Sequence, residues 1–167
     1  MTPEEQNAFL SKWHAEAIRY MDNAQETLKR AGRDGSQYVD EKYVKTACGT
    51  AYNGVLVALD AWLKLKGIPE PNKKKQRKSI GYYTDAIATI NHKMGSTLRI
   101  AYDILHLDGY YDGMLSVKAI EGGFDAAYEI IGKIKPEHPI DVPETRGDKV
   151  KRVFNKMKIS LAVMLRF

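Results

Sequence analysis

Apolar residues recur every three to four positions along most of the chain, which is the spacing of one face of an α-helix. A first helix is expected to begin after Thr2, a residue type that caps helices, and to end at the glycine-containing segment 31–37. A second helix is expected from Asp40 to about Lys66, and residues 49–63 are apolar on more than one face, which predicts a central position. The inward stripes of these two helices are Phe9, Trp13, Ala17, Met21, Ala24 and Leu28, then Val44, Cys48, Ala51, Val55, Leu59, Trp62 and Leu63.

Two further helical stripes follow a proline-containing connection. The pattern predicts a third helix from about Ile80 to His106, a turn at "LDGYYDG" (107–113), and a fourth helix from about Met114 to Ile134. Gly122 and Gly123 lower the helix propensity of the fourth helix, by about 1 kcal/mol each. A closely approaching neighbour helix would explain these two glycines.

The remaining chain reads as a proline-rich linker, residues 135–148, and a last amphipathic helix from about Lys149 to Leu165. No alternating strand pattern and no internal repeat are visible. We therefore predict an all-α fold: an antiparallel, up-and-down four-helix bundle over residues 1–134, with an extra C-terminal helix in residues 135–167 packed on the same domain.

The composition is that of a soluble globular domain, with 167 residues, 44% hydrophobic and 28% charged. No apolar run approaches the roughly 20 residues that span a bilayer, and the start of the chain lacks the pattern of a secretory signal. Cys48 is the single cysteine, which excludes a disulfide within the chain. These features predict a cytoplasmic protein without a membrane segment.

The net charge of +5 comes partly from two basic clusters, and basic clusters attract phosphate groups. A nucleic-acid contact is one interpretation, and an ordinary solvated surface is the other. The first cluster is Lys73, Lys74, Lys75, Arg77 and Lys78, and the second is Lys149, Lys151, Arg152, Lys156 and Lys158.

The motifs of the common cofactor and metal sites are missing from the sequence. It has no G-x-x-x-x-G-K loop, no G-x-G-x-x-G and no H-E-x-x-H, and one cysteine cannot build a thiolate zinc site. We therefore predict no cofactor and no metal. Cys48 lies on an apolar stripe and is interpreted as a small core residue.

A polar ridge late in the third predicted helix is the candidate site. Arg99 and His106 are seven residues apart, nearly two α-helical turns, and Asp103 lies between them. One interpretation is an ordinary ion pair of Arg99 with Asp103, with His106 near the negative end of its helix. The other interpretation is a functional site.

The functional interpretation rests on a resemblance. The spacing from Arg99 to His106, with six residues between them, resembles the R-x4-6-H motif of the HEPN superfamily, helical bundles with this motif late in a long helix. The segment "AYNGVLVALDAWLKLKGIPEP" (51–71) is similar to the HEPN segment in which an Ala-Tyr pair precedes an apolar helix ending in Gly and Pro. The resemblance covers about residues 5–134.

The resemblance implies two alternative functions. Many members are metal-independent ribonucleases, commonly toxins paired with an antitoxin, whose Arg and His meet across a homodimer interface; others only bind. His106 would then be the general acid/base and Arg99 would stabilise the phosphate. Ile100 stands where the family usually has a polar residue, and Asp103 is placed to neutralise Arg99, which favours a binding or interaction module, associated with RNA or with a partner protein such as an antitoxin.

Tyr110 and Tyr111 follow the ridge and have two interpretations of their own. Their rings could pack beneath the turn and supply apolar area. They could instead stack on an RNA base or a partner protein beside His106.

Overall fold

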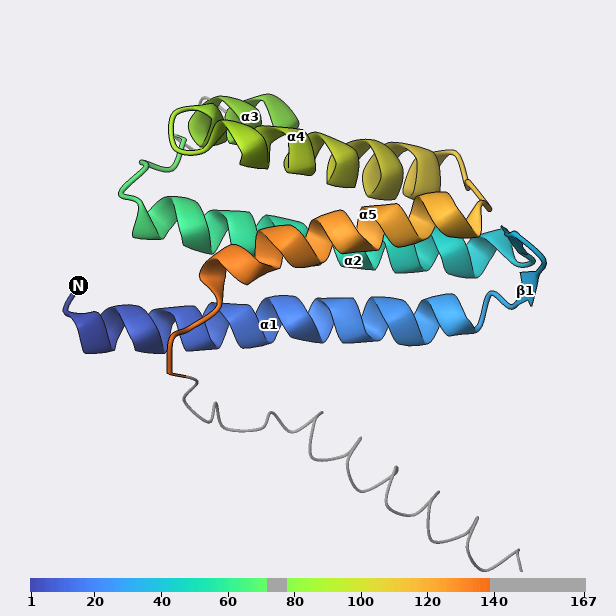
Figure 1. The fold of residues 1–167 in the computed structure, drawn as a ribbon, viewed down its shortest axis with the longest axis horizontal. Helices are drawn as coiled ribbons and strands as arrows, with labels where there is room; N and C mark the ends of the chain where they lie inside the picture. The colour runs from blue at the N-terminus through green and yellow to red at the C-terminus, as the bar shows by residue number, and fades with distance from the viewer. Residues whose placement is uncertain (72–77, 139–167) are drawn as a thin grey trace, which may run out of the picture.

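The computed structural model of this chain describes residues 1–71 and 78–138, and that part is mostly helical (Figure 1). The prediction of an all-α protein is confirmed. None of its helices in the described ranges has the length and apolar character needed to cross a membrane. The helices are α1 (Pro3–Lys29), α2 (Glu41–Leu65), α3 (Ile80–Ala88), α4 (His92–Ala101), the π-helix η1 (Tyr102–Tyr111), α5 (Val117–Ile131) and the 3₁₀-helix η2 (Gly132–Ile134).

The first two helices begin where their capping residues stand in the sequence. The Thr2 hydroxyl accepts a hydrogen bond from the Glu5 backbone N–H at 3.2 Å, and the Glu5 carboxylate accepts one from the Thr2 N–H. Asp40 caps α2 with a single bond, accepting from the Lys42 N–H at 2.9 Å. The two helices lie side by side and antiparallel (Figure 1).

A small hairpin joins α1 to α2. Its strands, β1 (Arg33–Asp34) and β2 (Gln37–Tyr38), pair antiparallel and are too short to show an alternating pattern in the sequence. The Tyr38 N–H donates to the Leu115 carbonyl at 2.8 Å, so the hairpin is fastened to the segment before α5.

The central position predicted for the second helix is confirmed. α2 packs against α1, α5 and η1, and every stripe position predicted for it is buried. Cys48 is fully buried among them, and burial raises the pKa of its thiol to about 12, as fits a small core residue.

The third predicted helix is wrong as a single element. The Asn91 side chain accepts a hydrogen bond from the Met94 N–H at 3.1 Å and starts α4, so the helical stripe is divided into α3 and α4. The predicted turn over 107–113 is also wrong. The chain continues from α4 directly into η1, which ends at Tyr111, and the backbone takes a positive φ of +73° at Gly113.

Glycines allow η1 to approach its neighbours closely. A Cβ on Gly109 would lie 2.6 Å from the Cys48 Sγ on α2, and one on Gly123 would lie 2.6 Å from the Ile104 Cγ2. The predicted close approach is therefore confirmed at Gly123. It is wrong for Gly122, where an added Cβ would meet no atom of the described chain within 4 Å. The fourth helix begins at Val117 rather than Met114, because Ser116 caps it through the Ala119 N–H.

Candidate functional site

The imidazole of His106 lies among four tyrosine rings. Ring centroids are 4.7 Å from Tyr52, 5.2 Å from Tyr102, 6.1 Å from Tyr110 and 5.1 Å from Tyr111. The rings of Tyr52 and Tyr110 are stacked on the imidazole at interplanar angles of 29° and 15°. We call these five residues the aromatic cluster.

The π-helix explains why four of the five rings gather from one element. Bonds from residue i to i+5 give wider turns than those of an α-helix, and π-helical turns are frequent at functional sites. η1 thus holds the rings of residues 102, 106, 110 and 111 in contact, while α2 contributes Tyr52. The cluster is fixed to α2 at Gly49, where an added Cβ would lie 2.9 Å from the Tyr110 Cδ2.

A groove of about 420 Å³ lies beside the cluster, between α2 and η1. His106 and Tyr110 form one wall, and Thr46, Thr50 and Asn53 belong to the other. The two threonine hydroxyls donate to backbone carbonyls one turn earlier in α2 and keep their acceptor capacity. Asn53 is exposed, and its side chain makes no hydrogen bond with any described residue. The groove therefore combines stacked rings with polar groups that can read hydrogen-bond donors and acceptors.

Burial shifts the pKa of two groups of the cluster, His106 and Tyr52, toward their neutral forms. Burial lowers the pKa of His106 from its ordinary value of 6.5, so the imidazole is neutral at physiological pH. Burial, followed by the charge of Tyr102, raises the pKa of Tyr52 to about 12. The neutral imidazole keeps one nitrogen as a donor and one as an acceptor.

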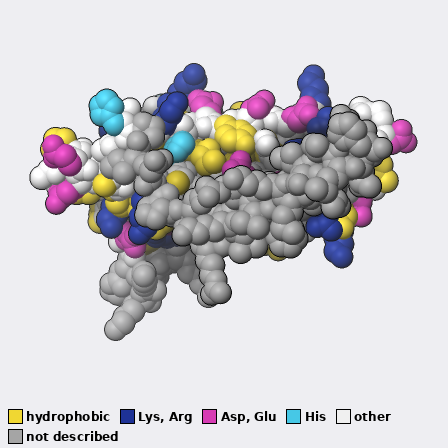
Figure 2. Space-filling view, turned by 90° about the horizontal axis from the view of Figure 1, so that it is seen from below, with side chains coloured by type: hydrophobic (Ala, Val, Ile, Leu, Met, Phe, Trp, Pro, Cys, Tyr) yellow, Lys and Arg dark blue, Asp and Glu magenta, His cyan; other side chains and the backbone are white. Residues whose placement is uncertain are grey.

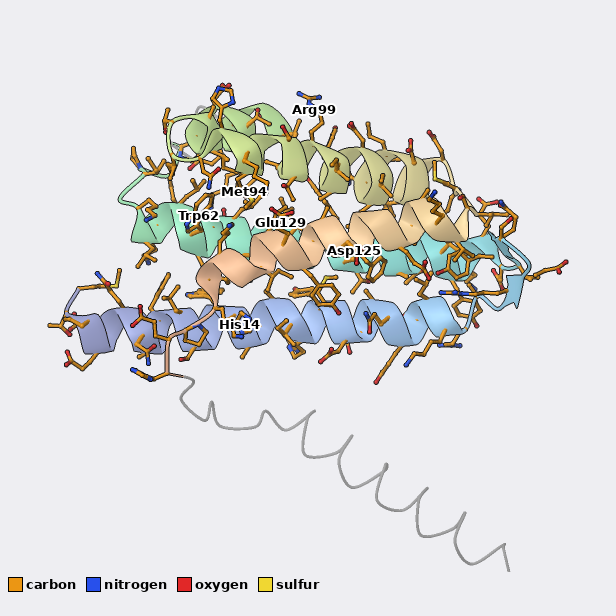
Figure 3. The ribbon with its side chains drawn as sticks, in the orientation of Figure 1. His14, Trp62, Met94, Arg99, Asp125 and Glu129 are labelled. Carbon is orange, nitrogen blue, oxygen red and sulfur yellow. The ribbon has the colours of Figure 1, made fainter. Side chains whose placement is uncertain are left out.

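Arg99 and Asp103 do not make the ion pair that one interpretation of the sequence expected: within the described ranges neither side chain has an ion-pair partner. The change from α- to π-helix at Tyr102 lies between Arg99 and His106, so the α-helical spacing that predicted one shared ridge does not hold across it. Arg99 is exposed and points away from α2 and α5 (Figure 3). The structure gathers His106 with the tyrosines and leaves Arg99 outside the aromatic cluster.

Tyr110 and Tyr111 do not pack beneath a turn. Their side chains are 44% and 60% exposed, so the first interpretation of this pair is wrong. Both rings contact His106, and the stacking on an RNA base or a partner protein that the second interpretation expects stays a prediction.

The basic run lies largely outside the described residues, which exclude Lys73, Lys74, Lys75 and Arg77, as they exclude the predicted C-terminal helix. Lys78 is described and is paired with Asp60 at 3.0 Å and with Glu70 at 3.4 Å. Burial alone lowers the pKa of Lys78, but these two carboxylates raise it above its ordinary value. This lysine is engaged within the protein rather than presented to a phosphate. On the face drawn in Figure 2, basic and acidic side chains are interspersed along the upper edge.

Among the described residues, no three His, Cys, Asp or Glu side chains come together as a metal site.

The sequence analysis missed most of the groove. Tyr102 is not among the candidate site residues of the sequence, and Tyr52 enters only through the segment 51–71 that is similar to a HEPN segment. A usable signal was present for α2: its apolar sequence carries polar residues at helical spacing, namely Thr46, Thr50 and Asn53.

Comparisons with known proteins identify relatives without assigning them an activity. A solved structure described as a protein of unknown function from Dyadobacter fermentans is 35% identical, with a TM-score of 0.66, and the match covers 74% of this chain and 94% of that one. A comparison with curated proteins found no match. The model of one family, described as Domain of unknown function (DUF5618), matches residues 12–136. That match spans well over half of the 167 residues, and the chain therefore belongs to the DUF5618 family.

Proposed function

We propose that this chain is a HEPN-like module that binds single-stranded RNA without cleaving it. In this proposal α1, α2, the continuous pair α4–η1, and α5 are the four helices of an up-and-down bundle in a cytoplasmic protein. The observation that carries the function is the aromatic cluster around His106, in which the exposed Tyr110 lines a polar groove and the exposed Tyr111 contacts both His106 and Tyr110.

Exposed tyrosine rings beside a polar groove suit unpaired bases. Single-stranded nucleic acids are bound by stacking bases on aromatic side chains, at about 1–3 kcal/mol per base. The edges of a stacked base need donors and acceptors, and Asn53, Thr46 and Thr50 supply both across the groove. A base pair inside a duplex hides both its faces and its edges, so the site favours single strands.

We also propose a homodimer formed through exposed apolar residues of α4 and η1. Each of these helices exposes one large apolar residue, Ile100 at 48% and Leu107 at 36%. Light scattering is expected to report about twice the chain mass of 18.9 kDa, and Ile100→Lys with Leu107→Lys should convert the dimer to monomers because a buried unpaired charge is costly. A wild-type monomer at tens of micromolar would contradict this assembly.

A metal-independent endoribonuclease of toxin–antitoxin type is the second candidate. His106 lines the groove as a neutral imidazole, the form that can remove a proton from a ribose 2′-hydroxyl. Arg99, with no ion-pair partner among the described residues, would contact the phosphate. Asp103 would orient either Arg99 or His106. An antitoxin protein would be the natural partner of such an enzyme.

One experiment separates the two candidates. Purified protein is mixed in EDTA with a fluorescent single-stranded RNA and, in a separate sample, with a fluorescent hairpin RNA, and anisotropy and RNA integrity are followed together. We expect anisotropy to rise for single strands more than for duplex, to fall with added salt, and the RNA to stay intact. Cleavage that His106→Ala and Arg99→Ala both abolish would establish the nuclease. Absence of both binding and cleavage would contradict both candidates.

A further inference from the structure

A second cavity lies on the other side of the molecule's central helix, among α1, the hairpin and α5. Its volume is about 520 Å³, larger than the groove beside His106 and within the usual range for small-molecule sites of about 300–1,000 Å³. Its floor is apolar: Leu28, Tyr38 and Phe124 line it, each at most 9% exposed. It is a concave apolar site that the proposed RNA-binding function does not use.

The cavity is held open by contacts that do not depend on a ligand. The hairpin is fastened to the start of α5 by the hydrogen bond from Val117 to the Ser36 carbonyl at 3.0 Å, beside that from Tyr38 to Leu115. At its mouth the Arg33 guanidinium pairs with Glu121 at 2.8 Å and donates to the Tyr38 hydroxyl at 3.2 Å. These charges satisfy each other, so they are not the groups that select a ligand.

Two other charged side chains at the cavity are free to contact a ligand, because no described residue pairs with them. Lys29 on α1 and Asp125 on α5 both line it, and both are exposed. Neither side chain has a hydrogen bond or ion pair within residues 1–71 and 78–138. Asp125 lies on the side of α5 that faces α1 (Figure 3). The cavity therefore offers one cation from α1 and one anion from α5, and the two do not pair with each other.

We propose that this cavity binds a free aromatic α-amino acid. The ligand's carboxylate pairs with Lys29, its ammonium group with Asp125, and its ring lies on the floor formed by Tyr38 and Phe124. Aromatic rings gain from contact with other rings beyond the area they bury. A purely apolar ligand would cover the floor but leave both charged walls unused, and a simple anion would leave the floor exposed. The proposal is independent of RNA binding, since it involves other residues.

The probe is L-phenylalanine, added to the full chain and followed by calorimetry and saturation-transfer NMR. We expect binding at concentrations up to the low millimolar range. N-acetyl-L-phenylalanine, which lacks the ammonium group, and L-phenylalaninamide, which lacks the carboxylate, should each bind about tenfold more weakly, a loss of about 1.4 kcal/mol.

Variants assign each charge to its partner. Lys29→Gln and Asp125→Asn should each weaken L-phenylalanine binding about tenfold, and both positions are exposed, so the fold is retained. Lys29→Gln should leave the affinity for L-phenylalaninamide unchanged, because that ligand has no carboxylate to lose. The matched control is Glu129→Gln, an exposed carboxylate one turn further along α5 that does not line the cavity, and it should bind as the wild type does.

Three results would overturn the proposal. The first is no detectable binding of L-phenylalanine by the wild-type chain at millimolar concentrations. The second is equal affinity for the amino acid and its two derivatives, which would show that the charges play no part. The third is full affinity in both Lys29→Gln and Asp125→Asn, which would place the ligand elsewhere. Each of these leaves the RNA assay unaffected.

Discussion

Replacing Tyr111 by alanine is expected to weaken the binding of single-stranded RNA by about 5- to 150-fold, the equivalent of about 1–3 kcal/mol for one stacked base. The side chain is 60% exposed, and it meets His106 at 84° and Tyr110 at 69°, so neither neighbour lies flat on it. Its ring is therefore open to a base, while its removal costs the core little. Fluorescence anisotropy with a labelled single strand measures the loss.

Two further variants make this test specific. Tyr20→Ala removes a ring from α1 that does not belong to the aromatic cluster, and its RNA affinity should match the wild type. Gly49→Ala keeps every ring but forces Tyr110 to move, because the new methyl group would lie 2.9 Å from the Tyr110 Cδ2. We expect weaker RNA binding with an unchanged helical circular dichroism spectrum. Wild-type affinity in Tyr111→Ala would remove the aromatic cluster from the proposed interface.

The second large effect concerns two adjacent glycines of α5, which should respond to alanine with opposite signs. Gly123→Ala is expected to destabilise the fold by about 1–3 kcal/mol, because overpacking forces neighbours to shift. The new Cβ would lie 2.6 Å from the Ile104 Cγ2 and 2.9 Å from the Leu105 Cδ2 in η1, and Leu105 is fully buried. Gly122→Ala meets no described atom within 4 Å and should stabilise the helix by about 0.5–1 kcal/mol.

Denaturant unfolding of the two variants measures both free energies against the wild type. Because the residues are neighbours in one helix, the helix propensity gained is the same, and the difference reports the packing of η1 on α5 alone. If both substitutions stabilised the fold equally, the close contact of η1 with α5 at Gly123 would be contradicted.

Much of the fold followed from local rules in the sequence. Thr2 and Asp40 cap α1 and α2 because short polar side chains satisfy the first backbone N–H groups of a helix wherever the chain places them. The central position of α2 followed from apolar residues on more than one face. These inferences succeeded because each depends on residues within a few turns of one another.

The third predicted helix shows where local rules became ambiguous. An asparagine in a continuous helical stripe can lie on the helix surface or cap a new helix, and the pattern of Tyr83, Ile87, Met94 and Leu98 fits both outcomes. In the fold Asn91 caps α4. The same stripe thus serves two helices, and the choice depends on how each packs against its neighbours.

The candidate site was determined only in part by the sequence. The chain order brings His106 near Tyr110 and Tyr111, so the sequence could name these three. In "LDGYYDG", Gly109 has the appearance of a turn residue, because glycine frees the backbone for turns; tertiary contact decides otherwise. Its missing side chain lets η1 lie against Cys48, the helix continues with π-helical turns, and Tyr52, fifty-four residues before His106, becomes its stacking partner. Periodicity and capping determine helices through residues that are close in sequence. The aromatic cluster instead depends on α2 and η1, which are far apart in sequence and pack at van der Waals distance, and no local pattern predicts that contact.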